Sequence, residues 1–408
     1  MKPQNVKINW KKNLICTWIG QLLCMAGYSA IMPFIPLFIR DKYHITDERE
    51  LGIWVSALAF FGFASFCISN PVWGVLADRF GRKLMLLRSY YVSTIIFPLM
   101  YFAPSVVWLI VIRFFISCFS GSVTAAQTLI VTTTPQEHHG VALGTLSTAV
   151  WSGNMIGFLC GAFFVDSLGY MWGFMACGAL YLVGGIITHI WVKENFVRPE
   201  KIARKQPGTS IFAQYRGYSL AIWIMLILFT VLGLVRQLEA PYVPILISSI
   251  TSPEKAVFYT GIVSLLAALG GLISGVLLGK LCDKFPPIAV AIPAVLISAA
   301  TMLVQGISGN LMIFSSSRFV NYLAAGGLDP AFQAMLAKLS PPEQRGSLFG
   351  LAASTRILGV MLASLLGGGI IYLAGIRAVF VCTAILFAAL LPILYIAQKY
   401  IKKSSSRE

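Results

Sequence analysis

The chain has 408 residues, of which 57% are hydrophobic and 11% are charged, and its mean hydropathy is +0.80. Soluble proteins carry roughly 25% charged residues, so this composition excludes a soluble domain, whose surface it could not cover. The net charge of +16 lies in short segments between long apolar runs, which is typical of membrane topology rather than of nucleic-acid binding. Runs of about 18 or more apolar residues predict an all-α, polytopic membrane protein.

The apolar runs predict twelve transmembrane helices. The longest connection, residues 193–218, is charged and contains two prolines. It predicts a cytoplasmic linker between an N-terminal six-helix bundle (1–192) and a C-terminal one (219–401), with a tail at 402–408. The first run is too long for the core of a signal peptide, so we expect it to stay as a span. The predicted spans are residues 14–39, 51–77, 84–103, 106–131, 141–166, 171–192, 219–247, 257–280, 287–306, 311–337, 346–373 and 377–401.

The basic residues orient these spans. If the N-terminus is cytoplasmic, 22 of the 31 lysines and arginines lie in cytoplasmic segments or at the cytoplasmic ends of spans, five lie on the other side, and four lie deeper inside spans. Cytoplasmic loops of membrane proteins carry an excess of lysine and arginine. The distribution therefore predicts that both termini are cytoplasmic.

The two halves of the sequence repeat each other at offsets of 205–208 residues. Each match falls on the same helix of each half, which chance rarely produces. Duplicated six-helix halves, with a substrate site at mid-membrane, are typical of the major facilitator fold, which the chain is therefore predicted to adopt. The matches are PQEHHGVALG (135–144) with PPEQRGSLFG (341–350), RFFISCFSG (113–121) with RFVNYLAAG (318–326), MPFIPLF (32–38) with APYVPIL (240–246) and, more weakly, GVLADRFGRK (74–83) with GKLCDKFPP (279–287).

The segment GVLADRFGRK at 74–83 joins the second and third predicted helices. Its glycines permit a tight turn, and its aspartate can cap or pair at a neighbouring helix N-terminus. An ordinary basic turn is the alternative. The pattern resembles the loop 2–3 signature of the major facilitator superfamily. This resemblance implies a motif that holds the two halves together and controls the conformational change between them. The residues of this motif are Gly74, Asp78, Arg79, Gly81 and Arg82.

Arg113 lies about eight residues into the fourth predicted span, where a buried guanidinium is costly and indicates function. Polar residues recur after it at helical spacing, beginning with Ser117, and the tenth span repeats the pattern with Arg318 and Tyr322. Interhelical hydrogen bonding is the alternative, which we favour for the serines and threonines. Arg113 resembles the helix-4 arginine of drug–proton antiporters, which is linked to proton transfer there.

Three carboxylates lie within the spans: Asp166, Glu239 and Asp329. Burial favours the neutral form of a carboxylic acid, so such a group can load and release a proton near neutral pH. Asp166 lies at a span end and is predicted to be interfacial. Glu239 is three residues after Arg236, so a simple ion pair between them is an open alternative. The predicted proton-coupling groups are Glu239, Asp329 and Arg113.

The predicted substrate pocket combines one face of the first span with polar residues of spans four, seven and ten. Methionine and aromatic side chains suit a promiscuous apolar pocket, although a core or lipid-facing stripe is equally compatible. The pocket residues are Gln21, Met25, Tyr28, Ser117, Arg236, Arg318 and Tyr322.

Gly153, Gly157 and Gly161 recur every four residues on the fifth span and predict close packing against another helix. The stripe resembles the antiporter signature G-x-x-x-G-P-x-x-G-G, with Phe158 in place of the proline and Ala162 in place of the last glycine. The eight cysteines are scattered without a CxxC pair, so we expect no metal site.

Taken with INWKKNLI, GRKLMLLRS and ALGTLSTAVWSG, these motifs resemble the drug:proton antiporter-1 family, in particular multidrug resistance exporters of the MdtG type. The resemblance implies a monomeric exporter of small amphipathic drugs in the lipid bilayer of a bacterial inner membrane, driven by protons and without a cofactor. A carrier for one metabolite, such as a sugar or amino-acid derivative, is the main alternative. A membrane enzyme or a transport-dead receptor is less favoured, because no catalytic cluster is evident.

Overall fold

The computed structural model describes residues 9–196, 220–340 and 345–405. All regular elements in these ranges are helices, and eleven helical segments are long and apolar enough to cross a membrane, which confirms the all-α membrane fold. The remaining predicted span, 311–337, was expected as one helix. It consists instead of α14 (Leu311–Ala325) and α15 (Leu328–Leu339), separated at Gly326 and Gly327.

The contacts divide the chain into two compact units. Unit 1 holds residues 1–46, 61–202 and 253–265, and unit 2 holds residues 47–60, 203–252 and 266–408. The predicted domain boundaries at 192 and 219 stay a prediction, because residues 197–219 lie outside the described ranges.

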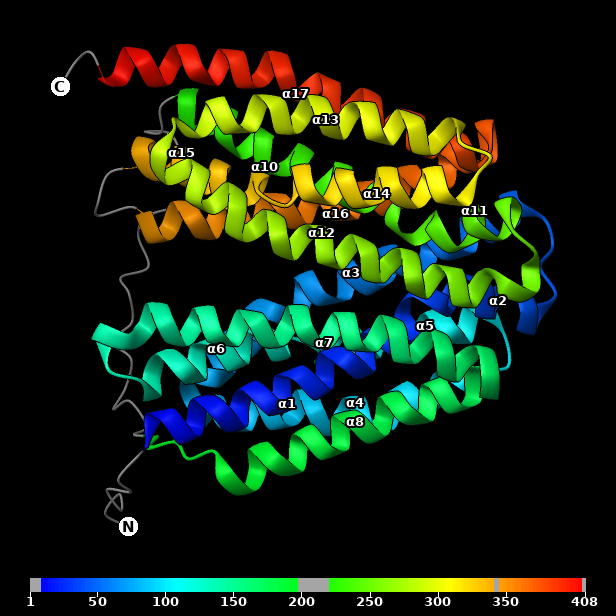
Figure 1. Cartoon of the computed structure of the whole chain (residues 1–408). Helices are drawn as coiled ribbons and strands as arrows, with labels where there is room; N and C mark the ends of the chain where they lie inside the picture. Colours follow the sequence, from blue (N-terminus) through cyan, green and yellow to red (C-terminus); the bar gives the residue numbers. More distant parts are fainter. Residues whose placement is uncertain (1–8, 197–219, 341–344, 406–408) are drawn as a thin grey trace. The chain divides into compact units, whose positions relative to one another are not determined.

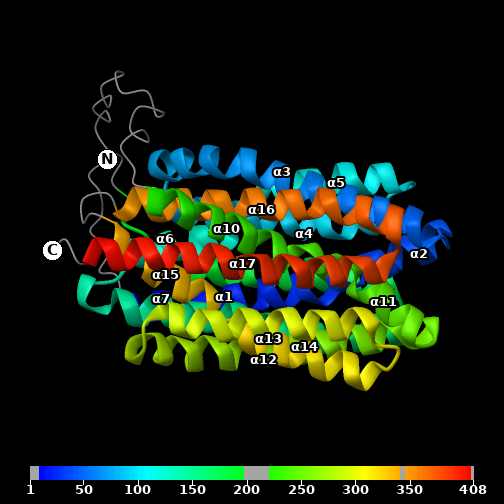
Figure 2. The ribbon, with the colours of Figure 1, turned by 90° about the horizontal axis from the view of Figure 1, so that it is seen from above.

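The first half of the chain contains α1 (Trp10–Ile31), η1 (Met32–Phe34), α2 (Ile35–Tyr43), α3 (Glu48–Phe80), α4 (Arg82–Tyr101), α5 (Val106–Phe119), α6 (Ser122–Thr133), η2 (Gln136–His138), α7 (His139–Leu168) and α8 (Tyr170–Trp191). The second half contains α10 (Leu220–Leu238), η3 (Ala240–Tyr242), α11 (Val243–Ile250), η4 (Pro253–Lys255), α12 (Ala256–Lys284), α13 (Pro287–Ile307), α14, α15, α16 (Arg345–Ala374) and α17 (Ile376–Ser405). Within each unit the long helices run along one common direction (Figures 1 and 2).

The repeated sequence segments coincide with matching helix breaks. In MPFIPLF, Pro33 and Pro36 lie where α1 changes to η1 and then α2, and in APYVPIL, Pro241 and Pro244 lie where α10 changes to η3 and α11. Proline lacks the N–H group of a regular helix and its ring crowds the preceding turn, so the helix breaks there. The second repeat ends at the α5–α6 break in one half and at the α14–α15 break in the other.

The glycine stripe of α7 packs against α1 in unit 1 (Figure 1). Gly153, Gly157 and Gly161 are buried, and a Cβ atom on each would collide with the backbone carbonyl of Leu22, Ala26 or Ala30. The two backbones can approach this closely only because α7 presents hydrogen atoms at these positions.

We expect Gly157→Leu to lower the free energy of unfolding by about 3 kcal/mol or more, because the new side chain meets main chain that cannot rotate away. Gly144→Leu is the matched control, since nothing lies within 4 Å of a Cβ atom at that α7 position. Thermal unfolding in detergent and the yield of monodisperse protein measure the difference. Equal stability of the two variants would contradict the packing role.

Candidate functional site

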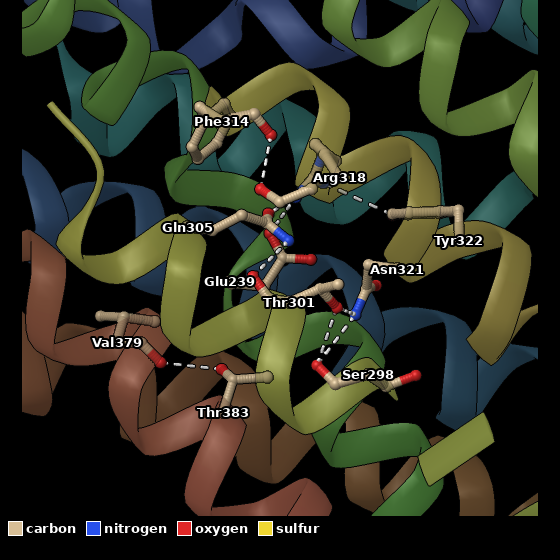
Figure 3. Close-up of polar contacts among 11 residues, drawn as sticks. Glu239, Ser298, Thr301, Gln305, Phe314, Arg318, Asn321, Tyr322, Val379 and Thr383 are labelled. Atoms are coloured by element: carbon tan, nitrogen blue, oxygen red, sulfur yellow. Dashed lines mark hydrogen bonds and ion pairs between the residues drawn. The ribbon is translucent and has the colours of Figure 1, made fainter. Parts of the chain in front are cut away.

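A buried ion pair lies inside unit 2. The Nη1 atom of Arg318, on α14, is 2.8 Å from Oε2 of Glu239, and the two side chains are 6% and 1% exposed. Glu239 follows the last residue of α10, so it projects from the helix break at η3 (Figure 3). Because a buried charge needs a partner, the two groups neutralise each other inside the bundle.

Neutral polar groups surround this pair (Figure 3). Arg318 Nη1 also donates to Oε1 of Gln305 at 3.2 Å, and its Nη2 donates to the hydroxyl of Tyr322 at 3.5 Å. The Tyr322 ring also lies 5.2 Å from the guanidinium carbon. Asn321, on the same helix, donates to the carbonyl of Ser298 and the hydroxyl of Thr301 on α13. The guanidinium is thus held between α13, α14 and the end of α10.

A second ion cluster in unit 2 surrounds Asp329. Its Oδ2 atom is 2.6 Å from Nη1 of Arg236 on α10, and its Oδ1 atom is 3.2 Å from Nη1 of Arg356 on α16. Arg236 also donates to the carbonyl of Ala325, at the end of α14. Asp329 lies in the first turn of α15, where the helix dipole favours a negative charge. One carboxylate therefore joins three helices.

Close packing of α10 and α16 brings the two arginines of this cluster to one carboxylate. A Cβ atom on Gly233 would collide with the backbone carbonyl of Arg356, and one on Gly359 would collide with that of Thr230. The helix backbones are therefore in contact beside the cluster, so that both long side chains reach Asp329.

The alternative ion pair between Arg236 and Glu239 is not formed, and that expectation was wrong. Glu239 pairs with Arg318, whereas Arg236 pairs with Asp329. The physical reason is that α10 ends at Leu238, between the two residues, so the regular spacing of a helix does not join them.

Arg113, the counterpart of Arg318 in unit 1, has a different environment. Its Nη2 donates to the hydroxyl of Tyr28 at 3.4 Å, and its guanidinium carbon lies 5.9 Å from that ring. Its Nε atom is buried without a hydrogen-bond acceptor. Among the described residues no carboxylate pairs with Arg113. Because Arg113 belongs to unit 1 and both predicted carboxylates to unit 2, their joint role in proton coupling stays a prediction.

The other predicted pocket residues of unit 1 lie in its interior. Gln21 is fully buried, where its Oε1 accepts from Tyr90 at 3.1 Å and its Nε2 donates to Ser122 at 3.4 Å. Met25 lies against Gly153 of α7, and Ser117 is 5% exposed on α5. Among the described pocket residues predicted on the first span, Tyr28 is the one that hydrogen-bonds with Arg113. Asp166 is exposed near the end of α7, as expected of an interfacial residue.

The motif at 74–83 forms the end of α3 and the start of α4. Gly74 and Arg79 are exposed, Arg82 begins α4, and the side chain of Asp78 lies outside the described residues. Gly81 has a φ of 100°, a conformation that favours glycine and lets the chain reverse within one residue. The turn geometry needs this glycine, whereas the gating role of the motif stays a prediction.

Glu194, which the sequence analysis overlooked, caps this turn from a position after α8. Its Oε1 accepts from the backbone N–H of Arg82 at 2.9 Å, and its Oε2 accepts from that of Lys83 at 2.8 Å. The first N–H groups of a helix have no partner inside the helix, and a carboxylate satisfies them and the helix dipole together. An acid at the start of a basic connection, as in KEN at 193–195, was the available signal.

We expect Glu194→Ala to lower the free energy of unfolding by about 1 kcal/mol, because two N–H groups at the start of α4 lose their acceptors. Glu194→Gln retains an acceptor oxygen and should lose less. Glu137→Ala removes an exposed acid from η2 and is the matched control. Thermal unfolding distinguishes the three variants, and equal values for Glu194→Ala and the control would contradict the capping role.

Comparisons with known proteins agree with this architecture. A family model described as the Major Facilitator Superfamily matches residues 17–313 and 257–408. The chain is 31% identical over 397 residues to "Multidrug resistance protein MdtG" of Klebsiella pneumoniae (strain 342), covering 96% of this chain and 95% of that protein. It is also 31% identical over 395 residues to the protein of that name from Salmonella schwarzengrund (strain CVM19633), covering 96% of both.

Two solved structures show a similar fold. A bacterial homologue of the human lysosomal transporter Spinster, in an inward-facing and unoccupied conformation, has a TM-score of 0.76 at 17% identity, covering 98% of this chain and 99% of that chain. A D-xylose–proton symporter has a TM-score of 0.71 at 16% identity, covering 93% of this chain and 96% of that chain.

Proposed function

Because the chain belongs to the Major Facilitator Superfamily, we propose that it exports amphipathic drugs or related small molecules in exchange for protons, by alternating access. The chain is a multi-pass membrane transporter and not an enzyme. Relatives that cover nearly the whole chain are named as multidrug resistance proteins, which supports drugs as the substrate class. The observation that carries proton coupling is the single carboxylate of Asp329 between two guanidinium groups.

Proton binding to Asp329 would change the balance of charge in its cluster. With the carboxylate ionised, Arg236 and Arg356 are both held against α15. A proton on Asp329 removes the negative charge and leaves two cations that repel each other, which loosens the joint between α10, α15 and α16. A ligand can drive a conformational change only by binding one state better than the other. The proton binds one conformation better than the other if the ion-pair cluster around Asp329 differs between the two conformations.

Glu239 is the second proton-coupling candidate in this proposal. Its partner Arg318 is almost fully buried, and the pair lies where α10 breaks into η3 and α11. Neutralising Glu239 would leave a charged guanidinium without compensation inside the bundle, which is more costly than at the Asp329 cluster. This difference in burial favours Asp329 as the group that cycles and Glu239 as the group that holds Arg318.

The proposal includes a bacterial inner-membrane location with both termini cytoplasmic and a functional monomer that uses the proton gradient and no cofactor. The excess of lysine and arginine in the predicted cytoplasmic segments supports this orientation.

Flux in proteoliposomes tests the function. Purified protein is reconstituted, a pH gradient is imposed, and movement of a fluorescent lipophilic cation is followed, with a protonophore and protein-free liposomes as controls. We expect accumulation that depends on the gradient and is abolished by the protonophore. Gradient-driven movement of a polar metabolite, with no movement of any amphipathic compound, would instead identify a metabolite carrier. A rate of drug movement that does not depend on the pH gradient would overturn proton coupling.

A further inference from the structure

A cavity of about 350 Å³ lies inside unit 1, between α3, α4 and the α5–α6 break. This volume is at the lower end of the range of small-ligand pockets, about 300–1,000 Å³, and suits a headgroup-sized ligand better than a drug. The residues of its lining that carry polar or aromatic side chains include Asn70, Trp73, Arg82, Arg88, Ser120 and Thr124.

Arg88 is the charged group that distinguishes this cavity. Its Nη2 atom donates to the carbonyl of Ser120 at 3.0 Å, and its guanidinium carbon lies 3.5 Å from the ring centroid of Trp73. That ring is fixed in turn, because its Nε1 donates to the carbonyl of Cys118 at 2.7 Å. The guanidinium is therefore held in one place on the wall of the cavity before any ligand arrives.

The charge of Arg88 is not compensated by the described residues. Its Nε and Nη1 atoms are shielded from solvent and have no hydrogen-bond acceptor, and no described carboxylate pairs with it. Shielded N–H groups without acceptors on a charged side chain are costly and require an explanation. Arg318 and Arg236, by contrast, each have a carboxylate within 2.8 Å.

We propose that this cavity is an anion site that takes a phosphoryl group, with Arg88 as its main ligand. A guanidinium matches the oxygens of a phosphate or phosphodiester, and the Asn70 amide and the Thr124 hydroxyl are further donors in the lining. An anion there supplies the negative charge that Arg88 lacks among the described residues. The site is independent of the proposed proton-coupling groups Glu239 and Asp329, which lie in unit 2.

The position of the cavity suggests two sources for this group. Arg88 is six residues, about 9 Å along the helix axis, from the start of α4, near the start of the predicted span that begins at residue 84. Large apolar side chains next to the cavity are exposed, with Val75 67% and Leu84 52% accessible, as expected of a surface that meets acyl chains. The phosphoryl group can thus belong to a phospholipid headgroup or be free phosphate from solution.

Thermal unfolding of the delipidated, purified full chain in detergent tests the site, with dioleoylphosphatidylglycerol in one arm and inorganic phosphate in the other. We expect saturable stabilisation in at least one arm, which identifies the source. Arg88→Gln should weaken the apparent affinity about tenfold or more. Lys12→Gln is the matched control, because it removes one positive charge from an exposed position of unit 1, on α1.

Thr124→Leu provides a second variant that leaves Arg88 in place and fills the cavity with an apolar side chain. It should lose the ligand effect while keeping the unfolding midpoint of the ligand-free protein, which separates binding from folding if Arg88→Gln is unstable. Absence of saturable stabilisation in both arms would overturn the proposal. An equal loss of affinity in Lys12→Gln would also overturn it, because the effect would then come from general surface charge.

Discussion

Asp329→Asn is expected to reduce proton-driven transport to the protein-free background, by at least about tenfold, while the protein stays folded. The amide has the shape and the neutral charge of the protonated carboxyl group, so the cluster between α10, α15 and α16 stays in its loosened state, although the amide oxygen can still accept from Arg236 or Arg356. The amide cannot gain or lose a proton, so the pH gradient can no longer change the charge of this cluster. The measurement is gradient-driven flux in proteoliposomes. Counterflow exchange of substrate needs no pH gradient, and we expect it to persist in this variant.

Asp166→Asn is the matched control for this experiment. It makes the same chemical change at an exposed carboxylate near the end of α7, so transport should be unaffected. Full proton-driven activity in Asp329→Asn would eliminate its coupling role. If Glu239→Gln alone were inactive while remaining folded, coupling would belong to the more deeply buried pair.

Glu239→Leu is expected to lower the free energy of unfolding by about 3–5 kcal/mol, because it leaves the buried guanidinium of Arg318 without a counter-charge. Arginine stays protonated under all ordinary conditions, so it cannot escape this cost by losing a proton. Gln305 and Tyr322 supply hydrogen-bond acceptors but no negative charge. Titration of the protein in mixed micelles with a denaturing detergent measures the loss.

A second substitution separates loss of the charge partner from loss of side-chain packing. Arg318→Met added to Glu239→Leu removes the isolated cation and should recover most of the stability, although not transport. Arg318→Met alone should be milder than Glu239→Leu and should gain stability as the pH falls, because a proton can neutralise the isolated Glu239. If the double variant were no more stable than Glu239→Leu, the pair would not contribute through charge compensation.

The helix breaks at the prolines have a clear sequence signal, whereas the α5–α6 and α14–α15 breaks were not predicted. The repeated segments containing Pro33 and Pro36, and Pro241 and Pro244, coincide with breaks in both halves, because proline disrupts the hydrogen-bond ladder wherever it occurs inside a helix. The break at Gly326 was missed, and the tenth span was expected to be continuous. Its apolar pattern continues through the two glycines, and glycine alone only weakens a helix.

Partner choice was not predictable, because it depends on which helices pack together. Sequence spacing left an Arg236–Glu239 pair as an open alternative, but α10 ends at Leu238 between the two residues, and their partners lie on α15 and α14. Gln21 was expected to line a pocket, yet the approach of α4 and α6 surrounds it with hydrogen-bond partners.

The sequence by itself determined the membrane class, the apolar spans, the two repeated halves and the small-residue stripe of α7, because each depends on local composition or on spacing along one helix. The tertiary structure decided the pairing of Asp329 with two arginines, the capping of α4 by Glu194 and the position of Arg88, which no described carboxylate neutralises. Each of these depends on atoms that are distant in sequence and come within hydrogen-bonding distance only when the helices pack. Short-range electrostatic and hydrogen-bond energies depend on that distance, which sequence spacing does not specify.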